Sequence, residues 1–178
     1  MDKINARDLF IHEVSITLSA ELIICELLPV MREEATNHLL KEGFARHLVE
    51  SEDQAAKLQM MLDELGGQFD PIPSYPALGI RQEHDAYVAS ARTPWAVDMG
   101  LLGGALKTEH FEIASYKVLI ETATLMHNGR YVKLLQESLR QEQHTAEMLE
   151  FVVAKRLHEE TYMAGADLAS DRELTLTR

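Results

Sequence analysis

Two glutamates interrupt the apolar face of a predicted helix. Between residues 94 and 126, apolar side chains recur every three or four residues, as on one face of an α-helix. Glu109 and Glu112 fall on that same face, because residues three apart in a helix point in similar directions. A buried carboxylate is costly unless it is hydrogen-bonded, paired with a cation or bound to a metal. The fold must therefore bring partners to these two side chains.

The rest of the chain predicts further helices of the same kind. Apolar periodicity predicts long helices over about residues 4–34, 37–65, 94–126 and 130–158, and a short helix over 78–91. Gly66-Gly67 and Asn128-Gly129 are turn signals, and three prolines between residues 71 and 76 exclude regular helix there. Pro29 predicts a kink or an early end in the first helix.

Short turns and one long connection favour a particular bundle. Two antiparallel hairpins joined by a crossover of roughly 25 residues, which contains the short helix, are typical of the ferritin-like arrangement. We therefore expect an all-α, ferritin-like four-helix bundle over residues 1–163. Residues 164–178 are polar without clear periodicity, and we expect them to form a frayed C-terminal tail.

The charge balance limits the partners. The formal net charge of −12, from 29 acidic and 17 basic residues, disfavours nucleic acid and favours cations. We find no apolar run near the roughly 20 residues that cross a bilayer, and no signal peptide, so we expect a cytoplasmic protein without a membrane partner. The single cysteine, Cys25, is expected in the core and excludes an intramolecular disulfide.

Hairpin geometry predicts that polar residues of all four long helices share one level. Residues equally far from a short turn lie at equal height, at about 1.5 Å per residue. Glu21 is then level with Glu50, and Glu112 is level with His144, within about one turn of Glu142. The predicted layer comprises Glu21, His47, Glu50, Glu109, Glu112 and Glu142.

Carboxylates and an imidazole on four facing helices are the donors that a di-iron or di-manganese centre requires. We therefore predict that these residues bind two metal ions, which would also relieve the repulsion between carboxylates. His47 is either a ligand or a hydrogen-bonded core histidine, and Glu142 is either a ligand or an ion-pair partner of Arg140 or Lys155. We expect His110 and His144 to hydrogen-bond to the ligands.

Four segments together resemble the YciE/YciF-type ferritin-like family of bacterial stress proteins. They are residues 12–21, 44–52 (FARHLVESE), 109–116 (EHFEIASY) and 139–142 (LRQE), of which EHFEIA is the most specific. The resemblance covers about residues 9–153. It implies a ferritin-like bundle, a homodimer, a dinuclear metal site and no assigned activity.

The sequence departs from that family at two positions. Ser51 stands where the family has Thr, and Gln141 stands where the family has the first of two glutamates. The neutral amide of Gln141 lowers the charge of the site, and we expect it to weaken binding of one metal ion. Storage ferritins repeat Glu-x-x-His, whereas here His47 precedes Glu50, so ferroxidase activity does not follow from the resemblance.

Two functions from different classes fit these observations. The first is a ferritin-like stress-response protein with a carboxylate-bridged dinuclear iron or manganese site, acting in iron oxidation or in removal of peroxide or oxygen; whether it is an enzyme stays open. The alternative is a non-catalytic helical dimer that acts as a structural or interaction protein, with a metal-free polar core. An oxygenase or desaturase is a third option, and it requires a substrate cavity.

Overall fold

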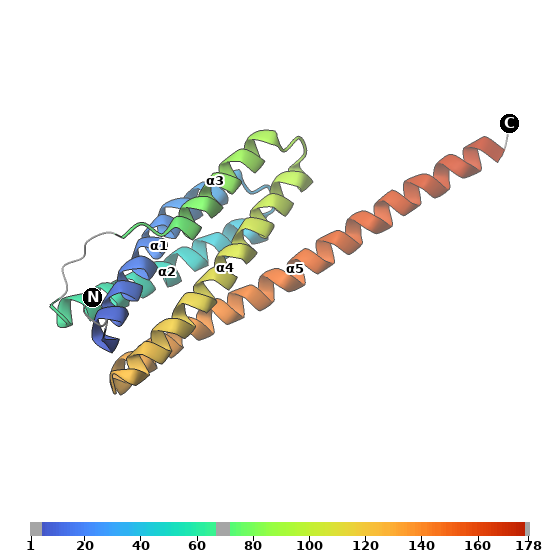
Figure 1. Cartoon of the computed structure of the whole chain (residues 1–178). Helices are drawn as coiled ribbons and strands as arrows, with labels where there is room; N and C mark the ends of the chain where they lie inside the picture. The colour runs from blue at the N-terminus through green and yellow to red at the C-terminus, as the bar shows by residue number, and fades with distance from the viewer. Residues whose placement is uncertain (1–4, 67–71, 177–178) are drawn as a thin grey trace.

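Five helices form the part of the chain that the structure describes. The computed structural model describes the backbone of residues 5–66 and 72–176, and the side chains of these residues as far as Lys155. The elements are α1 (Ala6–Glu34), α2 (His38–Glu64), α3 (Tyr75–Ser90), α4 (Pro94–Leu125) and α5 (Gly129–Leu176). Short turns join α1 to α2 and α4 to α5, and the long connection carries α3, which packs on α1 and α4 (Figure 1). The predicted all-α, ferritin-like bundle is confirmed.

The helix starts follow the capping rules. The side chains of Asn5, Asn37 and Thr93 each accept a hydrogen bond from a backbone N–H in the first turn of α1, α2 and α4. Helix α3 begins at Tyr75, earlier than predicted, because Pro76 lies in its first turn, where a missing N–H costs nothing. Helix α1 continues through the exposed Pro29 to Glu34, so the predicted early end is wrong.

Helix α5 is longer than the apolar periodicity indicated. It ends at Leu176 rather than near His158, so the predicted helix end was wrong. Figure 1 shows this helix projecting well past the rest of the bundle. Residues after 158 lack an apolar stripe but include many good helix formers, and propensity does not depend on a buried face. The division into a bundle over 1–163 and a tail over 164–178 stays a prediction.

The hydrophobic core is divided into two clusters along the bundle. One cluster includes Phe10, Leu18, Leu58, Tyr116 and Leu135. The other includes Ile24, Leu28, Phe44, Leu102 and Ala105. On each helix the polar residues of the predicted layer lie between the two clusters, so apolar packing closes this layer above and below.

Helix α1 contains a long window of apolar residues with few charges. By length and composition it could cross a membrane, which corrects the sequence expectation, although 56% of its most apolar window is buried inside the bundle. A buried core helix passes the same test as a membrane span. Its burial against α2 and α4 accounts for the apolar residues without a bilayer.

One glycine of α4 makes room for a side chain of the neighbouring helix α3. A Cβ atom at Gly100 would lie 2.0 Å from the Tyr87 ring of α3, which is far inside van der Waals contact. The backbone of α4 continues as helix through Gly100, Gly103 and Gly104. Gly100 therefore permits close contact between α3 and α4.

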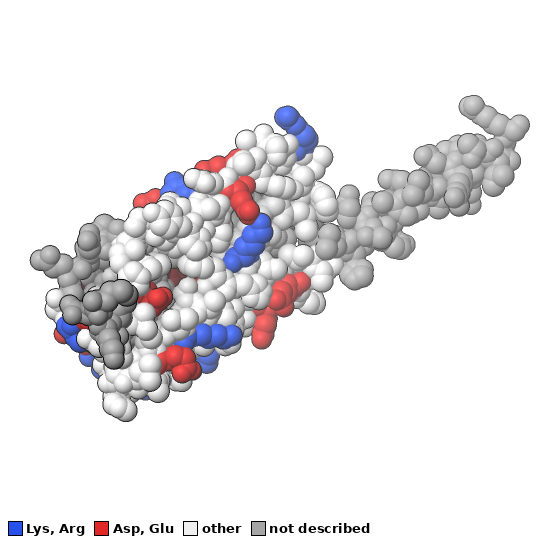
Figure 2. Space-filling view, viewed as in Figure 1, with Lys and Arg blue, Asp and Glu red and all other residues white. Residues whose placement is uncertain are grey.

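The surface charges are mixed. On the face shown in Figure 2, acidic and basic side chains are scattered singly and in pairs rather than gathered into a basic patch. This face therefore offers no electrostatic footprint for a nucleic-acid backbone.

A buried aspartate of α4 holds the turn between α1 and α2. One carboxylate oxygen of Asp98 accepts from the Thr36 backbone N–H at 2.7 Å, and the other accepts from the Thr36 hydroxyl at 2.7 Å. The first oxygen also accepts from the Asn37 N–H at 3.4 Å. Asp98 thereby ties the first hairpin to the second.

We predict that Asp98→Ala lowers the free energy of unfolding by about 1 to 3 kcal/mol, because it removes three hydrogen bonds that a buried carboxylate accepts from a partly exposed turn. Urea unfolding of the purified protein measures the change. Asp98→Asn retains one carbonyl acceptor and should recover part of the loss. Equal stability of all three proteins would show that the turn does not need this carboxylate.

Candidate metal centre

All four long helices contribute buried polar side chains to one layer. Glu21 comes from α1, His47 from α2, Glu109 and Glu112 from α4, and Glu142 from α5. Glu21, Glu109 and Glu112 have no exposed surface, and Glu142 and His47 are 1% and 5% exposed. Chain segments far apart in sequence therefore converge here, as the hairpin geometry predicts.

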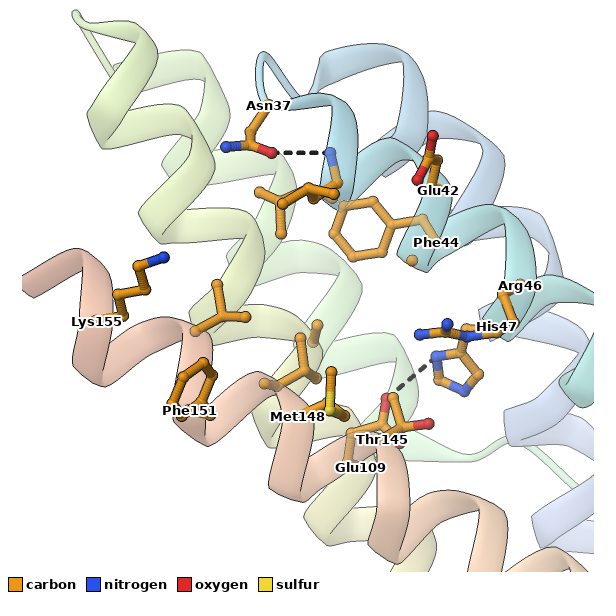
Figure 3. A pocket seen from close by; sticks show the side chains of 16 residues that line it. Asn37, Glu42, Phe44, Arg46, His47, Glu109, Thr145, Met148, Phe151 and Lys155 are labelled. Atoms are coloured by element: carbon orange, nitrogen blue, oxygen red, sulfur yellow. Dashed lines mark hydrogen bonds and ion pairs between the residues drawn. The ribbon is translucent and has the colours of Figure 1, made fainter.

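Four of these residues form a compact group. One ligand atom from each of His47, Glu109, Glu112 and Glu142 can be chosen so that all lie within 4.8 Å of one another. His47 Nδ1 lies 3.1 Å from a Glu109 oxygen, a contact visible in Figure 3. His47 Nε2 lies 4.0 Å from Glu112 Oε2 and 3.7 Å from Glu142 Oε2. A single cation between these atoms could contact all four side chains.

Glu21 lies beside this group and holds a tyrosine. The Tyr116 hydroxyl donates a hydrogen bond to Glu21 Oε1 at 2.6 Å, within the buried layer. The other Glu21 oxygen has no hydrogen-bond partner. Tyr116 is thus a core residue that positions Glu21.

Glu50 does not join the group. It is partly exposed, although its charge contributes to the raised pKa values of Glu109 and Glu142. Three residues rotate a helix by about 300°, which turns Glu50 about 60° from His47, toward the edge of the buried face. His47, Ser51 and Gln54 occupy the centre of that face instead. Equal height alone does not bring a side chain inward.

The sequence interpretation missed Gln54. This side chain is fully buried, and its Nε2 donates to Gln141 Oε1 at 3.1 Å and to Glu142 Oε1. The available signal was its position seven residues after His47, on the same helical face. Gln141 therefore pairs with Gln54 at the edge of the layer. Its predicted effect on metal affinity stays a prediction.

The other predicted histidine roles need correction. His110 and His144 are exposed, and His110 Nε2 lies 3.3 Å from Glu150 on the surface. Neither therefore supports the buried ligands. His84 of α3 is the other buried histidine of the described residues, and its ring nitrogens lie 2.8 Å from Glu34 Oε2 and 3.0 Å from Asp85 Oδ1.

When its glutamates are ionised, the buried layer has too few hydrogen-bond donors for its acceptors. Both carboxylate oxygens of Glu109 and of Glu112, one oxygen each of Glu21 and Glu142, and Nε2 of His47 have no hydrogen-bond partner. A metal-free polar network is stable only when its buried groups are satisfied. Oxygen and imidazole donors facing a common centre fit a divalent transition metal. The residues present therefore fit the cation that the sequence predicts.

Burial dominates the electrostatics of the layer. It raises the pKa of Glu109 to about 11, aided by the charge of Glu142, and raises the pKa of Glu21 to about 8. The pKa of Glu112 is well above its usual value, first through burial and then through the charges of Glu21 and Glu142. Without a cation, Glu21 and Glu109 therefore hold protons at neutral pH. A divalent ion would replace the protons.

His47 is held in its neutral form. Burial, with a smaller contribution from the charge of Arg46, lowers the pKa of His47 to about 4. A neutral imidazole keeps a lone pair, which is the form that binds a metal ion. Its unpaired Nε2 is the nitrogen nearest to Glu112 and Glu142.

The architecture and the buried carboxylates define a ferritin-like four-helix bundle protein with a candidate metal site. A family described as "Domain of unknown function (DUF892)" matches residues 5–162. The chain belongs to this family, the YciF type of ferritin-like proteins, so the resemblance in the sequence is confirmed.

Known relatives share most of this chain. Protein YciF of Escherichia coli K12 is 30% identical over 139 residues, which cover 78% of this chain and 84% of YciF. The crystal structure of the E. coli stress protein YciF superposes with a TM-score of 0.82 over 88% of this chain and 99% of that one, at 27% identity. YcfI of Rhodopseudomonas palustris, described as a candidate structural protein, has a TM-score of 0.79 at 28% identity, over 84% of this chain and 95% of its own.

A more distant structure shares the fold alone. A ferritin-like, diiron-carboxylate protein of Bacillus anthracis has a TM-score of 0.68 at 17% identity, over 85% of this chain and 99% of that one. This likeness supports the ferritin-like fold assignment.

Proposed function

We propose that this protein binds iron or manganese in the buried layer and acts in a bacterial stress response. His47, Glu109, Glu112 and Glu142 would hold one ion. Glu21 lies beside this group, and its charge raises the pKa of Glu112. Together with a carboxylate shared with the first ion, Glu21 would hold a second ion. Glu50 lies at the edge of the buried layer. The observation that carries the proposal is the set of buried carboxylate oxygens without hydrogen-bond donors.

The protein supplies a buried, preorganised set of donors. Bound iron or manganese would supply electron transfer toward dioxygen or peroxide. Tyr116 orients Glu21 and Gln54 orients Glu142, so two carboxylates are fixed before an ion arrives. The two apolar clusters exclude bulk water above and below the layer. Iron oxidation or removal of peroxide or oxygen is therefore the proposed activity.

The relatives support the stress role and also keep a second candidate open. E. coli YciF is named a stress protein, whereas YcfI is described as a candidate structural protein. The second candidate is a metal-free helical dimer with a structural role. A homodimer and a cytoplasmic location, both expected from the sequence, belong to either proposal.

Metal titration separates these candidates. We predict that chelator-treated protein binds Mn²⁺ tightly, with loss of the free-ion signal in electron paramagnetic resonance, and that iron-loaded protein consumes hydrogen peroxide. Glu112→Gln should abolish both, because it removes a buried anionic ligand. Glu121→Gln is the matched control, since Glu121 lies exposed on the same helix. Absence of Mn²⁺ binding by the unaltered protein would favour the structural role.

A further inference from the structure

A cavity of about 440 Å³ opens between α2 and α5. These two helices contact each other far less than the helices within each hairpin do, which leaves the space between them. Figure 3 shows Phe44 of α2 on one side, and Met148 and Phe151 of α5 on the other. The volume lies within the range of about 300 to 1,000 Å³ that small-molecule sites occupy.

The walls of this cavity are mostly apolar, and the lining extends along α5. The apolar lining residues are Leu39, Leu40, Phe44, Ala105, Met148, Leu149, Phe151 and Val152. Along α5 the lining runs from Thr145 to Lys155, which at 1.5 Å per residue is about 15 Å. A mostly apolar cavity of this length fits an unbranched alkyl chain better than a compact polar metabolite.

The inner end of the cavity reaches the buried layer. His47 and Glu109 both line it, and Figure 3 shows their contact at this end. His47 is 5% exposed and Glu109 has no exposed surface, yet Nε2 of His47 and both Glu109 oxygens have no hydrogen-bond partner. The cavity is thus a path from the surface to unpaired polar groups, and not merely a gap in side-chain packing.

The charges on the rim favour an anionic end group. Lys155 lies at the outer end of the lining and Arg46 lies beside His47, whereas Glu42 is the acidic rim residue. Within the described residues, neither Arg46 nor Lys155 has an ion-pair partner. In a chain with a formal net charge of −12, a lysine at the outer end of this cavity, without an ion-pair partner among the described residues, suits a carboxylate.

We infer that this cavity binds a medium-chain fatty acid. Its carboxylate would meet Lys155 at the outer end, and its alkyl chain would lie between α2 and α5, pointing toward His47 and Glu109. This binding does not need a metal ion, so it goes beyond the proposed function. It also supplies the substrate cavity that an oxygenase or desaturase requires.

A plug in the cavity tests the inference. A Cβ atom at Gly43 meets nothing within 4 Å, and Gly43 lines the cavity, so Gly43→Phe has free space to fill. Laurate binding to chelator-treated protein is measured by calorimetry. We expect Gly43→Phe to weaken it by about tenfold or more. Gly103→Phe is the control, because Gly103 also has free space but lies outside the cavity lining.

A charge reversal tests the orientation. Lys155→Glu should weaken laurate binding by about tenfold while leaving dodecanol binding unchanged, because only laurate carries a carboxylate. Lys133→Glu on the same helix, which lies outside the cavity lining, should change neither. Equal loss of laurate and dodecanol binding in Lys155→Glu would overturn the assigned orientation.

Two further outcomes would overturn the inference. One is unchanged laurate affinity in Gly43→Phe. The other is that the unaltered protein elutes as a dimer in size-exclusion chromatography, and that Gly43→Phe dissociates this dimer whereas laurate does not. That result would show that a second copy of the chain covers the cavity. Mn²⁺ binding is measured on the same variants. If Gly43→Phe still binds Mn²⁺, the variant is folded and the metal site is intact. A negative result for laurate then concerns the cavity alone and not the proposed metal site.

Discussion

Saturating Mn²⁺ should raise the melting temperature of the chelator-treated protein by roughly 10 °C. An ion that binds only the folded state at a thousand times its Kd stabilises that state by about 4 kcal/mol. In a domain of this size each kcal/mol shifts the melting temperature by about 2 to 4 °C. The effect is large because the ion replaces protons on carboxylates that burial and mutual repulsion otherwise destabilise. Differential scanning fluorimetry measures it.

Two variants make this thermal shift specific. Glu112→Gln removes an anionic ligand from the layer and should abolish the shift, whereas the exposed Glu121→Gln should retain it. Mg²⁺ should shift the melting temperature less than Mn²⁺, since the site includes an imidazole nitrogen, which Mg²⁺ disfavours. An equal shift in Glu112→Gln would show that Mn²⁺ binds elsewhere.

The second large effect is the pH dependence of the metal-free protein. A carboxyl group whose pKa is raised by folding binds more protons in the folded state than in the unfolded state, so stability falls as pH rises. For Glu21 this loss runs from about pH 4.5 to about 8, and for Glu109 it runs on to about 11. The pKa of His47, lowered to about 4, has the opposite effect, but only below its unfolded value of 6.5. Above pH 6.5 the carboxyl groups therefore determine how steeply the free energy of unfolding falls with pH.

Glu109→Gln should flatten this slope and stabilise the metal-free protein at alkaline pH. Each carboxyl group that stays protonated only in the folded state contributes about 1.4 kcal/mol per pH unit. Removing Glu109 should decrease the slope between pH 6.5 and 8.5 by about that amount, while metal binding is lost. Urea unfolding in chelator at pH 6.5, 7.5 and 8.5 measures the slope. An unchanged slope would mean that Glu109 is ionised in the folded protein without a metal.

The buried polar layer could be predicted from the sequence because, in a helical hairpin, residues equally far from the turn lie at the same height along the bundle. Glu21, Glu109, Glu112 and Glu142 lie where that rule places them, between two apolar clusters. The rule does not specify rotation about the helix axis, which is why Glu50 was placed with the ligands although it lies at the edge.

Other errors have the same physical origin. His110 follows Glu109 directly, and a helix turns about 100° between neighbours, so one side chain is buried and the other is exposed. Gln54 was missed because an uncharged amide on a buried face does not stand out in a sequence as a carboxylate does. The cavity between α2 and α5 depends on how far apart two helices pack, which periodicity does not encode.

The most direct test of the central claim is anomalous diffraction from crystals of protein purified without chelator. Data collected on both sides of the iron and manganese absorption edges locate and identify bound ions. The account predicts anomalous density between His47, Glu109, Glu112 and Glu142, with a second peak beside Glu21 if the centre is dinuclear. A layer without anomalous density, in protein whose melting temperature does not respond to added Mn²⁺ or Fe²⁺, would contradict it.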